Sequence, residues 1–287
     1  MLAHYLLSLL CLGFALLVLV LPVTADELAP QLTATPEVVA EGGQLYLVDP
    51  DIPGRPRIPL GYADATAGFA ARDDREKPPQ EGVLFIGSST FTRWSDVAQF
   101  FPGYPVVNRA FGGSKVWELW QWADRAVLPH KPRVIVVYIG DNDLASFKKQ
   151  ATPTDPWEPN PQAVAFFIKY VRLFVERVRS QVPEARFIFL GVKPSVARWL
   201  GWETVYKPAN AALAAYCATD PKHLAYLDTA PLILGPDGKP RAELFVQDGL
   251  HLQHDAYQAW AQLIAPTLAK MWQDAGGPEV PPPPPAL

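Results

Sequence analysis

Residues 83–89 read Val-Leu-Phe-Ile-Gly-Ser-Ser, a short apolar run that ends in one glycine and two serines. Four further runs of this kind follow along the chain: Pro105–Val107, Val134–Ile139, Phe187–Leu190 and Ala225–Leu227. Continuous apolar runs without alternation are typical of parallel strands that are buried on both faces. The sequence therefore predicts five such strands, the first of which leads directly into Ser88 and Ser89.

Helical patterns lie between these runs. In the clearest one, apolar residues recur at steps of three and four from Val164 to Val178, before Pro183. Similar patterns cover residues 64–75, 115–127, 209–218 and 255–272. Because strands alternate with helices, we expect an α/β fold, a three-layer α/β/α sandwich around a five-stranded, mostly parallel sheet.

Two segments flank the predicted sandwich, which covers residues 64–274. Residues 26–63 are rich in Pro and Gly, and only Gln44–Val48 has strand-like character, so we expect a partly β lead-in. Residues 275–287 contain the run Pro281–Pro285, which favours a disordered polyproline II tail.

The N-terminus has the pattern of a targeting signal. Leu6–Pro22 is almost entirely apolar and is followed by Val23-Thr24-Ala25, small residues of the kind that signal peptidase requires. We expect residues 1–25 to be a signal peptide and the body to be exported, either periplasmic or secreted. Since no Lys or Arg precedes the run and its length approaches that of a membrane span, the alternative is an uncleaved segment that associates with a membrane.

Composition argues against nucleic-acid partners, internal disulfides and Cys-based metal sites. The formal net charge is -4 and no run of Lys or Arg occurs, which argues against nucleic-acid binding. Only Cys11 and Cys217 are present, so a chain without its N-terminal segment has no internal disulfide and no Cys-based metal site. The sequence implies no metal or organic cofactor, and it gives no oligomeric state.

Chemically active residues follow the predicted strands. Ser89 comes after the first strand, Gly113 after the second and Asn142 after the third, whereas Asp248 and His251 precede the last helix. Ligands of open parallel sheets bind beyond the carboxyl ends of the strands. A serine hydroxyl becomes nucleophilic when an imidazole takes its proton and a carboxylate orients that imidazole. The spacing therefore suggests a Ser-His-Asp set.

A group of donors for a developing oxyanion is also available. The backbone N–H groups of Ser89 and Gly113 and the side-chain amide of Asn142 would form a three-donor oxyanion hole. Each residue has a structural alternative, because Ser89 can cap a helix, Gly113 can form a turn and His251 can be an ordinary surface histidine. Their occurrence in order, each behind a strand or before the last helix, favours the chemical interpretation.

These blocks resemble those of the SGNH/GDSL hydrolase superfamily, which is named for Ser, Gly, Asn and His. The similar stretches are Phe85–Ser89, Asn108–Ser114, Gly140–Asp143 and Asp248–His251. The resemblance implies a flavodoxin-like fold with Ser89 as nucleophile, Asp248 and His251 as its partners, and Gly113 and Asn142 in the oxyanion hole. Ser88 stands where the family name has Asp, as in an acetylhydrolase-like branch.

The function that the resemblance implies is hydrolysis of short-chain acyl esters, acetyl esters included. Alternatives are a lysophospholipase or thioesterase of the same fold, or a non-catalytic envelope module that binds a ligand. The substrate would be a small-molecule, carbohydrate or lipid ester. Aromatic and cationic side chains near the expected mouth are candidate substrate contacts, although core packing would equally explain the aromatic ones. These candidates are Arg109, Trp117, Arg198 and Trp199.

Overall fold

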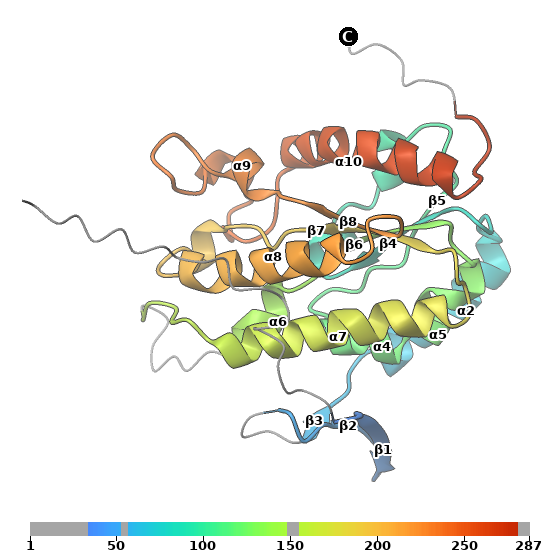
Figure 1. Ribbon diagram of the computed structural model, residues 1–287, viewed down its shortest axis with the longest axis horizontal. Helices are drawn as coiled ribbons and strands as arrows, with labels where there is room; N and C mark the ends of the chain where they lie inside the picture. The colour runs from blue at the N-terminus through green and yellow to red at the C-terminus, as the bar shows by residue number, and fades with distance from the viewer. Residues whose placement is uncertain (1–33, 53–56, 148–154, 281–287) are drawn as a thin grey trace, which may run out of the picture.

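The computed structural model describes residues 34–52, 57–147 and 155–280, and their main body is a three-layer α/β/α sandwich (Figure 1). The central sheet has the strand order β5-β4-β6-β7-β8 and every neighbouring pair is parallel. Its strands are β4 (Val83–Gly87), β5 (Val106–Asn108), β6 (Val134–Tyr138), β7 (Arg186–Leu190) and β8 (Leu224–Leu227). This is the flavodoxin-like order. The predicted α/β class and the five strands are confirmed.

Helices cover both faces of the sheet, which explains why the strand sequences are apolar without alternation. All residues of β4, β6 and β7 are buried. One face packs against α3 (Ser89–Thr92), α9 (Ala230–Ile233) and α10 (His254–Asp274). The other packs against α2 (Ala63–Glu76), α4 (Val116–Gln121), α5 (Ala123–Ala126), α6 (Asp141–Ser146), α7 (Pro161–Arg179) and α8 (Glu203–Ala218). Short 3₁₀ turns span Val97–Phe100, Leu128–His130, Val196–Arg198 and Ala242–Leu244.

Two of the predicted helices differ from the sequence pattern. The single helix expected over residues 115–127 is divided into α4 and α5 at Trp122, whose φ of -98° and ψ of 12° depart from helical values. The Trp122 indole donates to the carbonyl of Gly61 at 2.8 Å, a contact from far away in the sequence. Helix α8 starts at Glu203, before the expected residue 209. It continues through Pro208, which cannot donate a backbone hydrogen bond.

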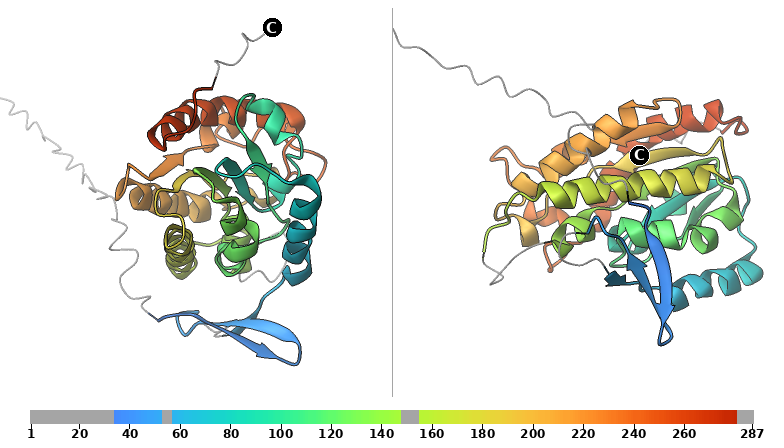
Figure 2. Two further views of the ribbon diagram at one scale, coloured as in Figure 1. Left: turned by 90° about the vertical axis from the view of Figure 1, so that its right-hand side faces the viewer. Right: turned by 60° about the horizontal axis from the view of Figure 1, so that its bottom comes forward.

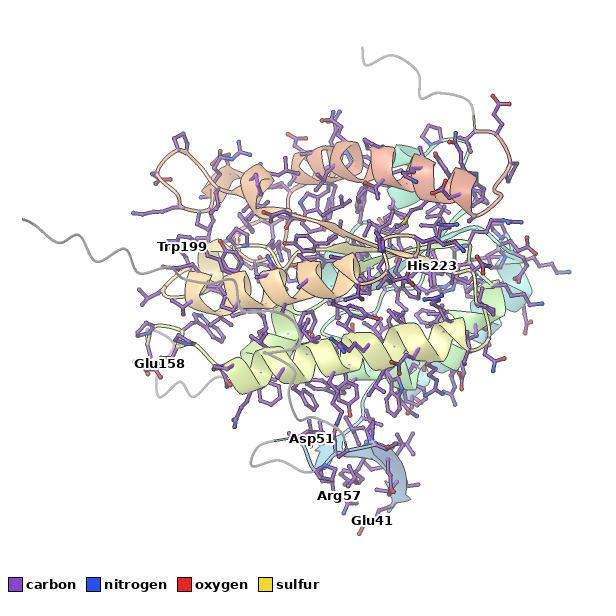
Figure 3. All side chains as sticks on the ribbon, in the orientation of Figure 1. Glu41, Asp51, Arg57, Glu158, Trp199 and His223 are labelled. Atoms are coloured by element: carbon purple, nitrogen blue, oxygen red, sulfur yellow. The ribbon has the colours of Figure 1, made fainter. Side chains whose placement is uncertain are left out.

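The lead-in folds into a small antiparallel sheet on the outer side of the α4, α5 and α7 layer (Figure 2). It consists of β1 (Glu37–Glu41), β2 (Gln44–Val48) and β3 (Arg57–Pro59). Figure 3 shows Asp51 where this sheet meets the body. There the Lys169 ammonium of α7 bonds to Asp51 at 2.7 Å and to both carboxylate oxygens of Asp49 at 2.9 Å.

The two ends of the chain are only partly described. The expected signal peptide, residues 1–25, lies outside the described residues, as do residues 281–287 of the proline-rich tail. The start of that tail packs on α10, because the Trp272 indole donates to the Pro278 carbonyl at 2.8 Å. Among the helices within residues 34–280 that the structure describes, none combines the length and the apolar character that a membrane crossing needs.

Candidate active site

The carboxyl ends of the parallel strands meet at one end of the molecule, on the left in Figure 1, where β4 turns into α3. The turn depends on Gly87, whose φ is 148°. A Cβ atom there would lie 2.0 Å from the Tyr138 carbonyl oxygen of β6, so only glycine fits. Ser89 follows as the first residue of α3, where its backbone N–H has no acceptor within the helix.

Ser89, His251 and Asp248 form one continuous chain of hydrogen bonds. The Oγ atom of Ser89 lies 2.8 Å from Nε2 of His251, and Nδ1 of His251 lies 2.6 Å from Oδ2 of Asp248. An ionised carboxylate can only accept, so the ring proton belongs on Nδ1. Nε2 is then left as the acceptor for the Ser89 hydroxyl, which is the arrangement that a general base requires.

The loop before α10 holds the Asp248 carboxylate in its charged form. Its Oδ1 atom accepts the backbone N–H groups of Leu250 and His251, both at 2.9 Å. Desolvation acts to raise the pKa of Asp248, but the hydrogen bonds from His251 and Leu250 outweigh it and hold the pKa well below its ordinary value. The carboxylate therefore remains ionised, and able to orient His251, over the whole working pH range of an enzyme.

Gly113 and Asn142 lie beside this chain. Residues 111–114 form a turn that rests on Ser89, since a Cβ atom on Gly112 would lie 3.6 Å from the Ser89 Cβ. Asn142 reaches the same turn from α6, and its Nδ2 donates to the Ser114 carbonyl at 3.2 Å. The structure thus brings together Ser89, Gly113, Asn142, Asp248 and His251, which the sequence singled out, from four separate segments of the chain.

A largely buried charge cluster of Asp141, Lys193 and Arg198 adjoins Asn142. The Asp141 carboxylate lies 2.8 Å from the Lys193 ammonium and 3.2 Å from the Arg198 guanidinium. Desolvation acts to raise the pKa of Asp141, but these two cations outweigh it, and the pKa lies below its ordinary value. Arg198 also donates to the Asp141 carbonyl at 2.9 Å and to Oδ1 of Asn142 at 3.4 Å. Its charge therefore fixes the side-chain amide of Asn142.

The family model of GDSL-like lipases and acylhydrolases matches residues 66–259, which is most of the sandwich. The chain belongs to this family. It is accordingly a carboxylic ester hydrolase of α/β fold. No curated protein matches the chain in sequence.

Solved structures agree with the fold. A GDSL-like lipase from Bacteroides thetaiotaomicron is 15% identical, with a TM-score of 0.55, over 71% of this chain and 97% of that protein. A Bacteroides fragilis protein described as an acylhydrolase is 18% identical, with a TM-score of 0.55, over 77% of this chain and 98% of the other. At identities of 15% and 18%, these likenesses show that this chain shares the fold of the two proteins.

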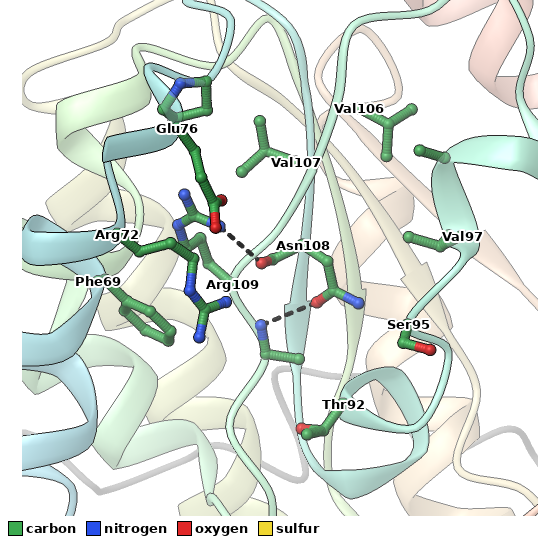
Figure 4. A pocket seen from close by; sticks show the side chains of 13 residues that line it. Phe69, Arg72, Glu76, Thr92, Ser95, Val97, Val106, Val107, Asn108 and Arg109 are labelled. Carbon is green, nitrogen blue, oxygen red and sulfur yellow. Dashed lines mark hydrogen bonds between the residues drawn. The ribbon is translucent and has the colours of Figure 1, made fainter. Parts of the chain in front are cut away.

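The four candidate substrate contacts lie in different environments. Arg109 is 3% exposed and pairs with Asp73, although it also borders a cavity of about 450 Å³ at the edge strand β5 (Figure 4). Trp117 is 1% exposed and packs on Phe166, so this hydrolase uses it as a core residue. Trp199 is half-buried at the same end of the molecule as the triad (Figure 3). Arg198 contacts Asn142, as described above.

Sequence reasoning missed three polar residues around the site. Lys193 and Tyr138 both form hydrogen bonds with Asp141. The position of Lys193 shortly after the apolar strand β7 was the one sign in the sequence that it lies near the site. Tyr62 donates from its hydroxyl to the Gly112 carbonyl at 2.8 Å. It precedes the sequence blocks of the family, and no local pattern marks it.

Proposed function

We propose that the hydrolase cleaves short-chain acyl esters through an acyl-enzyme formed on Ser89. The observation that carries this proposal is the unbroken hydrogen-bond chain from Ser89 Oγ through His251 to Asp248, with distances of 2.8 and 2.6 Å. Such a chain makes a serine hydroxyl nucleophilic without any other group.

In this mechanism, Ser89 Oγ attacks the ester carbonyl carbon while His251 Nε2 accepts its proton. The carbonyl oxygen becomes an oxyanion that accepts hydrogen bonds from the N–H groups of Ser89 and Gly113 and from the Asn142 amide. His251 next donates the proton to the departing alcohol. Water then attacks the acyl-enzyme with His251 again as the base, which releases the acid and restores Ser89.

The substitution Ser89→Ala tests the nucleophile. We expect kcat/KM for p-nitrophenyl acetate to fall by orders of magnitude, because the triad acts as a unit. The matched control is Ser180→Ala, which removes an exposed hydroxyl at the end of α7 and should leave activity unchanged. Activity of Ser89→Ala within about tenfold of wild type would contradict the assignment.

Labelling by a fluorophosphonate separates catalysis from simple ligand binding. The probe phosphonylates only an activated serine, so we expect modification of Ser89 in wild type and none in Ser89→Ala. An unlabelled wild-type protein would favour the non-catalytic envelope module instead.

Two features of the chain bear on the acyl group that the hydrolase accepts. The Gly-Ser-Ser first block resembles that of acetylhydrolase-like members and supports short acyl chains. The apolar side chain of Val196, which is 40% exposed beside the site, instead favours a longer, lipid-like chain. Val196 contacts the Asp248–His251 loop, because a Cβ on Gly249 would lie 3.3 Å from it. Comparing wild-type kcat/KM for acetate, butyrate and octanoate esters decides between a short-chain esterase and the long-chain preference expected of a lysophospholipase. An octanoyl thioester in the same assay tests the thioesterase alternative.

We also propose that the hydrolase is exported, on the basis of the apolar run Leu6–Pro22 and the small residues that follow it up to Ala25. Mass spectrometry of full-length protein expressed in bacteria distinguishes the two outcomes. Loss of residues 1–25 indicates a cleaved signal peptide, and an intact N-terminus in the membrane fraction indicates an anchor.

A further inference from the structure

The peptide bond between Gly112 and Gly113 could adopt two orientations, unless a neighbouring group fixes one of them. It is the central peptide of the turn Phe111–Ser114, which is closed by a 3.3 Å hydrogen bond from the Ser114 N–H to the Phe111 carbonyl. Gly113 has a φ of 81°, as at the third position of a type II turn. Rotating the central peptide by about half a turn converts type II into type I, and two glycines offer little steric resistance to that rotation.

The orientation of this peptide matters because its N–H is the proposed oxyanion donor. In a planar trans peptide the C=O of one residue and the N–H of the next point in opposite directions. A group that holds the Gly112 carbonyl therefore also aims the Gly113 N–H. The opposite orientation would turn the carbonyl oxygen, an electron-rich atom, toward the developing negative charge.

Tyr62 is the group that holds the Gly112 carbonyl. Its hydroxyl donates to the Gly112 oxygen at 2.8 Å, and it lies 2.7 Å from the position that a Cβ on Gly113 would take. Desolvation, and secondarily the Glu118 carboxylate, raise the pKa of Tyr62 to about 12, so the hydroxyl keeps its proton at any working pH. A donated hydrogen bond also polarises the peptide, which makes its N–H a better donor.

The position of Tyr62 is itself fixed. Its ring packs against Phe111 with centroids 5.0 Å apart, and its backbone has a left-handed φ of 68°. The neighbouring carbonyls are held by side chains of the body, because Trp122 donates to Gly61 at 2.8 Å and Arg125 donates to Ala63 at 3.1 Å. The hydroxyl therefore reaches Gly112 from a rigid support.

We propose that Tyr62 is a positioning residue of the oxyanion hole, which holds the Gly112–Gly113 peptide with its N–H toward the substrate carbonyl. The proposal rests on the proposed function of Ser89 and Gly113. Tyr62 lies at the junction between the lead-in and α2, before residue 66, where the match to the family begins. The proposal therefore assigns a role in the active site to a segment outside that match.

The substitution Tyr62→Phe tests the proposal, since it removes the hydroxyl and keeps the ring on Phe111. We expect kcat for p-nitrophenyl acetate to fall about tenfold with KM unchanged, less than the roughly 10²–10³-fold loss on removing an oxyanion donor outright. A trifluoromethyl ketone, which adds to Ser89 and places an oxyanion in the hole, should bind more weakly by a similar factor. The matched control is Tyr46→Phe in β2, whose ring lies against Arg57 in the N-terminal sheet.

Titration with a fluorophosphonate counts the competent sites, so that kcat is expressed per folded enzyme and loss of folding does not imitate the effect. Equal kcat and equal ketone affinity in Tyr62→Phe and wild type would overturn the proposal, and so would a raised KM with unchanged kcat, which indicates a substrate contact. Failure of the proposed function has a different signature, because wild-type Ser89 would then remain unlabelled.

Discussion

At the scale of single residues, the amide of Asn142 is held at both ends. Arg198 donates to its oxygen at 3.4 Å, and its nitrogen donates to the Ser114 carbonyl at 3.2 Å. Because the Arg198 guanidinium donates to the amide oxygen, the NH₂ group of Asn142 faces the turn Phe111–Ser114 beside Ser89. Hydrogen bonds to a charged group are the stronger kind, so the amide has one favoured orientation.

Replacing Asn142 should therefore affect the chemical step. We expect Asn142→Ala to lower kcat by about 10²–10³-fold with little change in KM, because the donor acts mainly on the oxyanion of the transition state. Steady-state kinetics with p-nitrophenyl acetate measure both constants. Gln262→Ala on α10 removes an exposed amide and serves as the control. A rise in KM at constant kcat would argue for substrate binding instead.

The sequence could place Ser89, Gly113, Asn142, Asp248 and His251 because each follows a strand or precedes the last helix, and topology alone brings such positions together. It could not place Trp117 or Tyr62. Whether an aromatic side chain points to the core or to the mouth depends on how the helices rotate as they pack, and no local pattern records that rotation. In the structure Trp117 is 1% exposed, because α4 packs with this side chain against Phe166 of α7.

At the scale of elements, the N-terminal sheet is attached to α7 through a buried ion cluster. Asp49 is fully buried and the Lys169 side chain is 7% exposed, while the Tyr170 hydroxyl donates to the same carboxylate at 2.7 Å. The strand Gln44–Val48 was predictable from its composition. Its attachment was not, because Lys169 and Asp49 are separated by 120 residues and each alone looks like an ordinary surface charge.

Removing the cation should destabilise the whole attachment. We expect Lys169→Met to lower the free energy of unfolding by about 3–5 kcal/mol, because it leaves the Asp49 carboxylate buried without its cation. Urea denaturation followed by circular dichroism measures the change. The control Lys222→Met breaks an exposed pair with Glu184, which should leave the free energy of unfolding nearly unchanged because solvent screens that pair. Equal losses of unfolding free energy in the two variants would show that the buried ion cluster contributes no more to stability than an exposed ion pair.

At the scale of the whole molecule, Asp143 couples the two loops that carry Gly113 and Asn142. It lies in α6 and accepts the Val116 backbone N–H of α4 at 2.7 Å. Its side chain is buried, and desolvation raises its pKa to about 7. In the unfolded chain a carboxyl of this kind titrates near its ordinary pKa of 3.8. Folding therefore binds a proton at this site between about pH 4 and pH 7.

The sign of the effect on stability follows from that proton. Because the native state holds it and the unfolded state has lost it, the contribution of Asp143 to stability is full below about pH 4 and decreases as the pH rises to about 7. We expect Asp143→Asn, which keeps an oxygen for the Val116 N–H and cannot ionise, to remove this decrease. Urea unfolding of both proteins from pH 4 to pH 7 gives the difference between their free energies, in which contributions from other titrating groups such as Glu118 and His130 largely cancel. That difference should grow in favour of the variant as the pH rises, since only the wild type must bury a negative charge at neutral pH or take up a proton to fold. Parallel curves would mean that Asp143 is ionised in the folded hydrolase and that its burial carries no such cost.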